Sequence, residues 1–348
     1  MLEKLKRQPL RVSDVFEYIS QGIVTTGNDI FYLKGRLEED KFIGFSKALD
    51  KEIILEKSIV KPILLGKDVK RYEKIQNKYF VIYPHSLDDN KTKPFKEKYF
   101  KNNYPLTYEY LLNFKDELIA KKIKYKNNSV DWFSLTRPRE ISIYEQNKLI
   151  TPQLSKGGYF TYDINKIYID AGCYSFIKNN DFKESYKFYL ALLNSKLMWF
   201  FIKNTSSVFS GGYYYYKPMY LNHFPLPKIE NIEDTKPFEI LVDYIMLLKT
   251  LDNQIDEYVP NSQIIKSFEE VLDAMVYELY FKEEFEDKNI EFIKYAKEDY
   301  MPLDEDKIKT ILDSYNILCE TKNKIRNNLI LMGIRLSDLI LPIKRSIV

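Results

Sequence analysis

Apolar residues recur along the chain with two different periods, and the period changes near residue 230. Before that point, short apolar runs bounded by Pro, Gly, Asn and Asp predict strands, such as residues 77–83, which Pro84 closes. After it, apolar residues recur every three or four positions, which is the period of an amphipathic helix. The pattern predicts an α+β fold, in which a mixed sheet with bracing helices is followed by a mostly α-helical C-terminal domain.

The same periods place the individual elements. Two helices, at residues 104–124 and 182–203, interrupt the strands, because their apolar residues fall on one helical face. Asp163 and Asn165 lie at the tightest turn between strands. Further strands are predicted near residues 149–150, 159–162, 167–169 and 174–177, and further helices at residues 237–251, 264–279 and 305–328.

Charge divides at the same place as the apolar period. The whole chain has a formal charge of +3, but residues 1–230 carry 38 Lys and Arg against 26 Asp and Glu, a net charge of +12. Residues 231–348 carry 15 against 24, a net charge of −9. We therefore expect two units with different partners. The partner of the basic N-terminal unit is expected to be a polyanion. The expected organisation is an N-terminal extension at 1–20, a recognition domain at 21–230 and an acidic helical domain at 231–348.

Several protein classes are excluded by composition. No run of about 18 apolar residues is present, so no membrane span is expected. The two cysteines, Cys173 and Cys319, are too few for a disulfide framework, and with only His85 and His223 beside them a zinc site lacks ligands. A reducing cytoplasm is the expected location.

Motifs for catalysis are largely missing. The chain has no Gly-rich phosphate loop, no glycine fingerprint for a nucleotide, no serine elbow and no Asp/Asn-Pro-Pro-aromatic tetrapeptide of amino-methyltransferases. Glu305 and Lys307, with Asp299 upstream, match the spacing of a Mg²⁺-dependent nuclease, which is one alternative. The other interpretation is that these acids open a helix at its positive dipole end. We expect no catalysis by this chain alone.

The basic part contains a constellation suited to DNA. Arg137 and Arg139 flank a proline, and Arg is the side chain that reads guanine bidentately, although both could equally pair with carboxylates. Glycines beside Lys156 permit a close approach to phosphate. Four consecutive tyrosines, at 213–216, alternate faces if extended, so two of them should be core, and tryptophans are more often core than stacking platforms. The candidate DNA-binding residues are Lys67, Arg71, Trp132, Arg137, Arg139, Lys156, Gly157, Gly158, Tyr159, Ser210, Gly211, Gly212, Tyr214 and Lys217.

The order of these segments resembles the TaqI-type C-terminal specificity domain, or target recognition domain, of type IIG restriction-modification enzymes and adenine-specific DNA methyltransferases. The resemblance covers most of residues 20–285. The matching stretches are 22–31 (GIVTTGNDIF), 60–72 (VKPILLGKDVKRY), the helix that begins at Tyr104-Pro105, 132–139 (WFSLTRPR), 148–153 (KLITPQ), 172–176 (GCYSF), 190–197 (LALLNSKL), 224–227 (FPLP) and 271–280 (VLDAMVYELY).

The resemblance implies a division of labour. In that family a methyltransferase domain transfers a methyl group from S-adenosylmethionine to a flipped adenine, and the recognition domain chooses the site. This chain lacks the methyltransferase motifs and the nuclease, so it is expected to be a specificity subunit or a fragment of a longer enzyme. Its partners would be double-stranded DNA and a methyltransferase or endonuclease domain or subunit. S-adenosylmethionine and Mg²⁺ are expected only in those catalytic domains. Besides the nuclease, a scaffold whose basic face binds an acidic protein is the remaining alternative.

Overall fold

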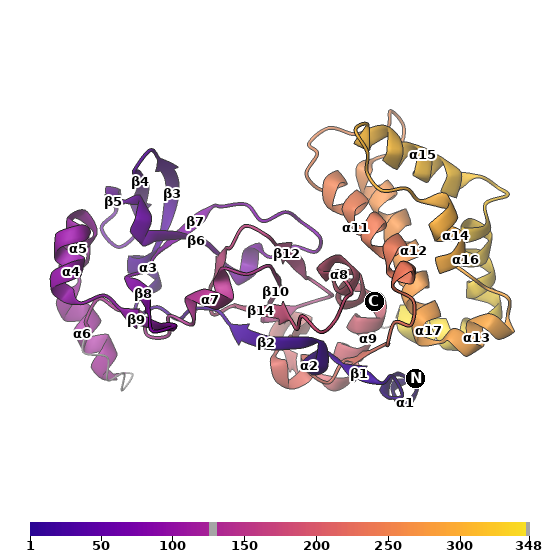
Figure 1. Cartoon of the computed structure of the whole chain (residues 1–348), viewed down its shortest axis with the longest axis horizontal. Helices are drawn as coiled ribbons and strands as arrows, with labels where there is room; N and C mark the ends of the chain where they lie inside the picture. The colour runs from indigo at the N-terminus through magenta and orange to yellow at the C-terminus, as the bar shows by residue number, and fades with distance from the viewer. Residues whose placement is uncertain (125–130, 346–348) are drawn as a thin grey trace.

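The computed structural model describes residues 1–124 and 131–345, and it has the predicted α+β architecture. A sheet-rich lobe forms one end of an elongated molecule, a four-stranded sheet lies near the middle, and packed helices form the other end (Figure 1). The N-terminal helix α1 (Leu2–Lys6) lies beside the helical end. There Gln8 Nε2 donates a hydrogen bond to the carbonyl oxygen of Tyr280 over 3.0 Å, which ties the start of the chain to the C-terminal helices.

The sheet-rich lobe is built on a six-stranded sheet with the order β13-β6-β7-β3-β4-β5. Its neighbouring strands are antiparallel, except that β13 and β6 run parallel. The parallel strand comes from far along the chain and fastens this lobe to the central sheet. The strands are β3 (Tyr32–Glu38), β4 (Lys41–Ser46), β5 (Lys51–Glu56), β6 (Val60–Leu64), β7 (Tyr79–Ile82) and β13 (Tyr168–Ile169).

Three helices cover the outer side of this lobe: α4 (Glu97–Asn103), α5 (Pro105–Leu112) and α6 (Lys115–Lys124). The Glu56 carboxylate at the end of β5 accepts hydrogen bonds from the N–H groups of Leu106 and Thr107, which satisfies the start of α5. The prediction of one helix over residues 104–124 is wrong at its middle. Asn113 Nδ2 donates to the carbonyl oxygens of Glu109 and Tyr110 there, and such side-chain competition for the backbone favours a break.

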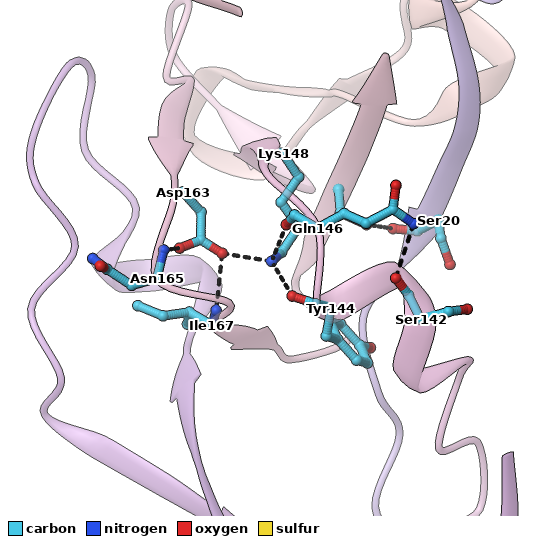
Figure 2. A network of polar contacts seen from close by, with 9 residues as sticks. Ser20, Ser142, Tyr144, Gln146, Lys148, Asp163, Asn165 and Ile167 are labelled. Atoms are coloured by element: carbon cyan, nitrogen blue, oxygen red, sulfur yellow. Dashed lines mark hydrogen bonds and ion pairs between the residues drawn. The ribbon is translucent and has the colours of Figure 1, made fainter. Parts of the chain in front are cut away.

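The central sheet is antiparallel, with the order β12-β10-β14-β2. Lys148 and Asp163 pair in register across β10 and β12, and their fully buried side chains form an ion pair (Figure 2). The same carboxylate accepts hydrogen bonds from the N–H groups of Asn165 at 2.8 Å and Ile167 at 2.9 Å, so the predicted turn at Asp163 and Asn165 is confirmed. The strands are β2 (Phe16–Gln21), β10 (Lys148–Pro152), β12 (Thr161–Asp163) and β14 (Cys173–Lys178).

A small three-stranded sheet extends from the central one. Strand β10 continues into β11, which pairs with β16, and β16 forms a hairpin with β15. The strands are β11 (Leu154–Ser155), β15 (Val208–Phe209) and β16 (Tyr213–Tyr215). Two further pairs are formed by β8 (His85–Asp88) with β9 (Lys91–Pro94) and by β1 (Leu10–Arg11) with β17 (Pro225–Leu226).

Two helices replace the single helix predicted over residues 182–203: α8 (Tyr186–Asn194) and α9 (Lys196–Thr205). The hydroxyl of Ser195, between them, accepts a hydrogen bond from the N–H of Met198 at 3.2 Å. Ser195 is therefore the N-cap of a new helix, a role for which serine is strongly preferred.

The C-terminal helices share one apolar core with α8 and α9, and this core continues across residue 230. Helix α11 (Lys236–Leu248) packs against both α8 and α12 (Asn261–Tyr280), and the rings of Phe188 and Phe238 meet edge-on with centroids 5.3 Å apart. The predicted helix at 305–328 is two helices, because Asn323 caps the second. The remaining helices of the described chain are α2 (Val12–Val15), α3 (Asn28–Phe31), α7 (Ile141–Tyr144), α10 (Pro218–Leu221), α13 (Lys282–Asp287), α14 (Ile293–Asp299), α15 (Lys307–Cys319), α16 (Lys324–Arg335) and α17 (Ser337–Arg345).

Candidate nucleic-acid interface

Loops from distant parts of the sequence meet at one end of the central sheet, opposite the Lys148–Asp163 ion pair. Main-chain hydrogen bonds connect them: the N–H of Gly22 donates to the carbonyl of Cys173 at 3.0 Å, and the N–H of Gln153 donates to that of Gly172. We call this region the convergent loop surface. It comprises residues 21–24, 65–68, 137–139, 152–153 and 170–173.

Close backbone packing holds the convergent loop surface together. The Asp170 carboxylate accepts hydrogen bonds from the N–H groups of Gly66 and Gly172, both at 3.0 Å. Burial raises the pKa of this carboxyl, and those hydrogen bonds oppose the rise. A Cβ atom on Gly22 would lie 2.1 Å from the carbonyl oxygen of Asp170, so only glycine fits there. Gly22, Gly66 and Gly172, which belong to three of the stretches that carry the family resemblance, therefore pack close together.

Arg139 secures the loop that it belongs to. Its Nε donates to the carbonyl of Gly22 at 3.1 Å, and its guanidinium also donates to Oε1 of Gln21 at 3.2 Å. Its backbone has φ of +63°, a conformation that non-glycine residues seldom adopt. Tyr83 donates its hydroxyl hydrogen to the carbonyl oxygens of Pro138 and Arg139, which helps to hold that geometry. The side chain of Arg139 therefore holds this loop in position.

Arg137 lies two residues earlier, with its side chain in solvent. Its backbone forms a two-way antiparallel bridge with Val24, with both N–H to O distances at 3.0 Å. The residue is exposed, and within residues 1–124 and 131–345 no carboxylate lies within ion-pair distance of its guanidinium. A rigid main chain with a free guanidinium is the arrangement that base reading requires.

Lys67 and Arg71 follow the same strand but face different ways. Lys67 is an exposed member of the convergent loop surface, and its Nζ lies 3.3 Å from the Tyr79 hydroxyl, an interaction that raises the pKa of Lys67. Arg71 turns toward the helical end, where its Nε lies 3.3 Å from Oε1 of Glu269 on α12 and its side chain is 22% exposed. The structure thus places Lys67 with the loops and Arg71 at the joint with the helices.

The two glycine-containing loops singled out in the sequence lie side by side. Strand β11 pairs with β16, so Lys156 comes to lie over the ring of Tyr213, with Nζ 4.7 Å from the centroid. Lys217 lies over Tyr215 in the same way at 4.2 Å. The hairpin connects to the convergent loop surface through the N–H of Tyr216, which donates to Gln153 at 2.9 Å. Exposed residues of these loops are Lys156, Tyr159, Ser210, Gly211 and Gly212, and Gly157 is half-buried.

Three of the candidate residues pack against the protein interior: Trp132 and Gly158 are buried, and Tyr214 is half-buried. Trp132 is 5% exposed, and its indole N–H donates to Glu97 at 2.9 Å. Gly158 is buried against the backbone of Asn194, and Tyr214 packs edge-on against Trp199 with centroids 5.3 Å apart. The four tyrosines alternate as predicted, with Tyr216 fully buried. We leave these three out of the proposed contacts.

Sequence reasoning missed exposed residues next to the candidates. Val208 and Phe209 are 62% and 45% exposed on β15, although the aromatic run at 213–216 drew attention to the other strand of the hairpin. The available signal was an apolar pair inside a Ser/Gly-rich loop. Lysines 70, 74 and 78 are also exposed, on the segment between β6 and β7, and their regular spacing of four was the signal there.

The acidic triplet of the nuclease alternative opens α15. Asp306 is the N-cap of this helix and accepts a hydrogen bond from the N–H of Lys309, so the helix-opening interpretation is confirmed. Asp299 instead accepts a hydrogen bond from Asn323 at 2.7 Å. Among the residues that the structure describes, no group of three His, Cys, Asp or Glu side chains is arranged to hold a metal ion.

A cavity of about 520 Å³ lies away from these loops, between residues 227–230 and helices α12 to α14. The Glu278 carboxylate at its wall accepts hydrogen bonds from the N–H groups of Phe292 and Ile293, at 2.8 and 2.9 Å. Burial raises the pKa of Glu278 to about 7, against the effect of those two hydrogen bonds. None of the candidate DNA-binding residues lines this cavity.

The fold is a mixed-sheet α+β domain joined to a helical region. Residues 61–226 match the family model of the TaqI-like C-terminal specificity domain, which is the domain that the resemblance named. No helix in the described part of the chain is long and apolar enough to cross a membrane.

A solved structure has a similar fold over most of the chain. It is the type IIL restriction-modification enzyme MmeI, determined in complex with DNA, which aligns with a TM-score of 0.50 at 10% sequence identity. The alignment covers 78% of this chain and 34% of that chain. The chain therefore spans about a third of the enzyme that it matches, and the likeness concerns the fold.

Proposed function

We propose that this chain recognises a specific sequence in duplex DNA on behalf of a restriction-modification system. The observation that carries the proposal is the convergent loop surface, whose loops are connected by main-chain hydrogen bonds while the guanidinium of Arg137 stays free. This surface lies in a chain that matches the specificity-domain family model. Lys67, Lys156 and Lys217 lie around it as cations for phosphate. MmeI, a solved structure of similar fold, was determined with DNA bound.

We assign chemistry to other parts of the assembly. In this proposal the chain directs the methylation of adenine, and cleavage where the assembly cleaves, by a methyltransferase or endonuclease domain or subunit. S-adenosylmethionine and Mg²⁺ belong to those catalytic parts. The family match and the restriction-modification enzyme among solved structures support this assignment.

The test is selection of preferred sequences from randomised duplexes, followed by measurement of affinity at graded salt. Arg137→Ala should weaken binding of the preferred duplex by about 5- to 100-fold and relax the preference at one base pair, because a bidentate base contact is worth about 1–3 kcal/mol. Arg139→Ala should relax the preference similarly, because it releases the loop from Gly22. Lys156→Ala should weaken all duplexes alike and reduce the slope of log K against log salt by about 0.9.

Lys322→Ala is the matched control, because it removes one exposed positive charge from the helical end. It should leave both affinity and preference unchanged. Absence of duplex binding by the wild-type chain, alone and with a methyltransferase partner, would contradict the proposal. Equal preference profiles for wild type and Arg137→Ala would contradict the role given to Arg137.

A further inference from the structure

The hairpin of β15 and β16 ends in an apolar surface that no part of the described chain covers. Val208 is 62% exposed, Phe209 is 45% exposed, and Tyr213 on the facing strand is 41% exposed. Phe209 pairs with Tyr213, so these two side chains share one face of a short two-stranded ribbon, and Val208, paired with Tyr214, lies on the other face. Burial of such side chains in a complex is favourable in proportion to the apolar area removed from water.

The ribbon is held in a defined shape. Gly211 and Gly212 have φ of +75° and +77°, a conformation that makes the tight turn at its tip and that side chains disfavour. At its base the Ser206 hydroxyl donates to the carbonyl of Tyr215 at 2.7 Å, and the hydroxyls of Ser207 and Tyr220 lie 2.7 Å apart. Binding therefore requires little ordering of the chain, which preserves affinity.

Charge around the ribbon favours a polyanion over an acidic or neutral protein surface. Residues 206–220 contain Lys217 and no Asp or Glu, and Lys156 lies over Tyr213 from the adjacent loop. The apolar tip is thus flanked by cations. That arrangement matches a DNA groove, in which phosphates line the edges and base edges form the floor.

We propose that the β15–β16 hairpin enters the major groove and that Val208 and Phe209 contact thymine methyl groups. The major groove is wide enough for a two-stranded β-ribbon, and the C5-methyl of thymine is the apolar group displayed there. This inference rests on the proposed function and makes it more specific, because it adds an apolar reading element to the polar one at Arg137.

The test replaces thymine with deoxyuracil, one position at a time, in the preferred duplex. For the wild-type chain, one or two replacements should weaken binding about four-fold each, the effect of one lost buried methyl group. In Phe209→Ser or Val208→Ser at least one of those replacements should have no further effect, because the contact is already lost. Lys156→Ala should bind more weakly overall yet keep the full sensitivity to deoxyuracil.

Phe209→Leu serves as the folding and shape control, because it retains an apolar side chain next to Tyr215, whose ring lies 5.6 Å from that of Phe209. It should keep most of the sensitivity, and the thermal unfolding of every variant should be compared with that of the wild type. Duplex binding that is insensitive to deoxyuracil throughout would overturn this inference and leave the proposed function intact. Loss of association with a methyltransferase subunit in Phe209→Ser, with DNA binding unchanged, would also overturn it. No duplex binding at all would overturn both.

Discussion

Lys148 and Asp163 show how a single residue pair positions the central sheet. Both side chains are fully buried, and the Lys148 ammonium also donates to the carbonyl oxygen of Tyr144 at 2.8 Å (Figure 2). Burial lowers the pKa of Lys148, and the adjacent carboxylate opposes that change. A buried charge without a partner is strongly destabilising, so each member depends on the other.

Asp163→Asn should lower the free energy of unfolding by about 3–5 kcal/mol, because it leaves the Lys148 ammonium without its counter-charge. Lys148→Met should also destabilise the protein. The double variant should lose less than the sum of the two, with a coupling energy of about 1–3 kcal/mol. Urea unfolding of all four proteins measures this. Lys93→Met, which breaks the exposed pair with Asp88, is the control and should cost under about 1 kcal/mol. Additive single effects would show that the two residues act independently.

Residue-level prediction succeeded where chemistry is local and failed where it depends on tertiary partners. The turn at Asp163 and Asn165 follows from local hydrogen bonding of short polar side chains, and the sequence shows it. The free state of Arg137 and the ion pair of Arg71 with Glu269 depend on residues far along the chain. The spacing of apolar residues along the sequence does not show which distant residues these arginines meet.

At the scale of elements, the turn between α8 and α9 joins the loop that carries Lys156 to the helices. Asn194 forms two hydrogen bonds with the backbone of Phe160: Oδ1 accepts from its N–H at 2.8 Å, and Nδ2 donates to its carbonyl at 3.0 Å. Ser195 caps α9, and the N–H of Lys196 donates to Asp273 on α12 at 2.8 Å. Three consecutive residues thus fix a loop, a helix and a neighbouring helix.

Asn194→Ala should loosen the loop that carries Lys156 without any change of charge. The backbone N–H and carbonyl of Phe160 lose their buried partners, which should cost about 1–3 kcal/mol of stability. Hydrogen exchange at the Phe160 amide should accelerate, and the affinity for all duplexes should fall alike. Asn204→Ala is the comparison, because in the described chain the Asn204 side-chain amide donates to the carbonyl of Phe200 in its own helix. An unchanged exchange rate at Phe160 in Asn194→Ala would refute the positioning role.

Helix breaks explain where the element-level prediction fell short. Apolar periodicity continues through Asn113, Ser195 and residues 320–323, so it predicts unbroken helices. In each case a polar side chain bonds the local backbone and ends or begins a helix. The predicted bounds of the strands lie closer to the observed bounds than those of the helices do, because Pro and Gly mark the strand ends.

Across the whole molecule, charge and packing follow different boundaries. Charge changes sign near residue 230, but the apolar core includes α8 and α9 together with α11 and α12. Ion pairs cross the same line, from Lys187 to Asp243 at 2.7 Å and from Lys196 to Asp273 at 3.2 Å. Part of the acidic charge of the C-terminal helices therefore binds the basic half directly.

Truncation after residue 230 should expose the buried face of α8, including Phe188 and Leu192, which are 0% exposed in the full chain. The shortened protein should bind a hydrophobic dye, aggregate and unfold at lower temperature than the full chain. Lys187→Met in the full chain removes only a partly exposed ion pair and should shift stability by less than about 1 kcal/mol. A soluble, cooperatively folded 1–230 fragment would show that the shared core is dispensable.

In the convergent loop surface, the residues that maintain the fold differ from the residues whose side chains face outward. Main-chain hydrogen bonds, the close packing at Gly22, and the side chains of Asp170 and Arg139 make its internal contacts. In the described chain the side chain of Arg137 takes part in no ion pair or hydrogen bond of this surface. Substitution there changes the outward chemistry at small cost in folding, whereas substitution of Gly22 would disturb the whole junction. Under the proposed function, a lineage can therefore acquire a new target sequence by exchanging outward side chains while it inherits the same junction unchanged.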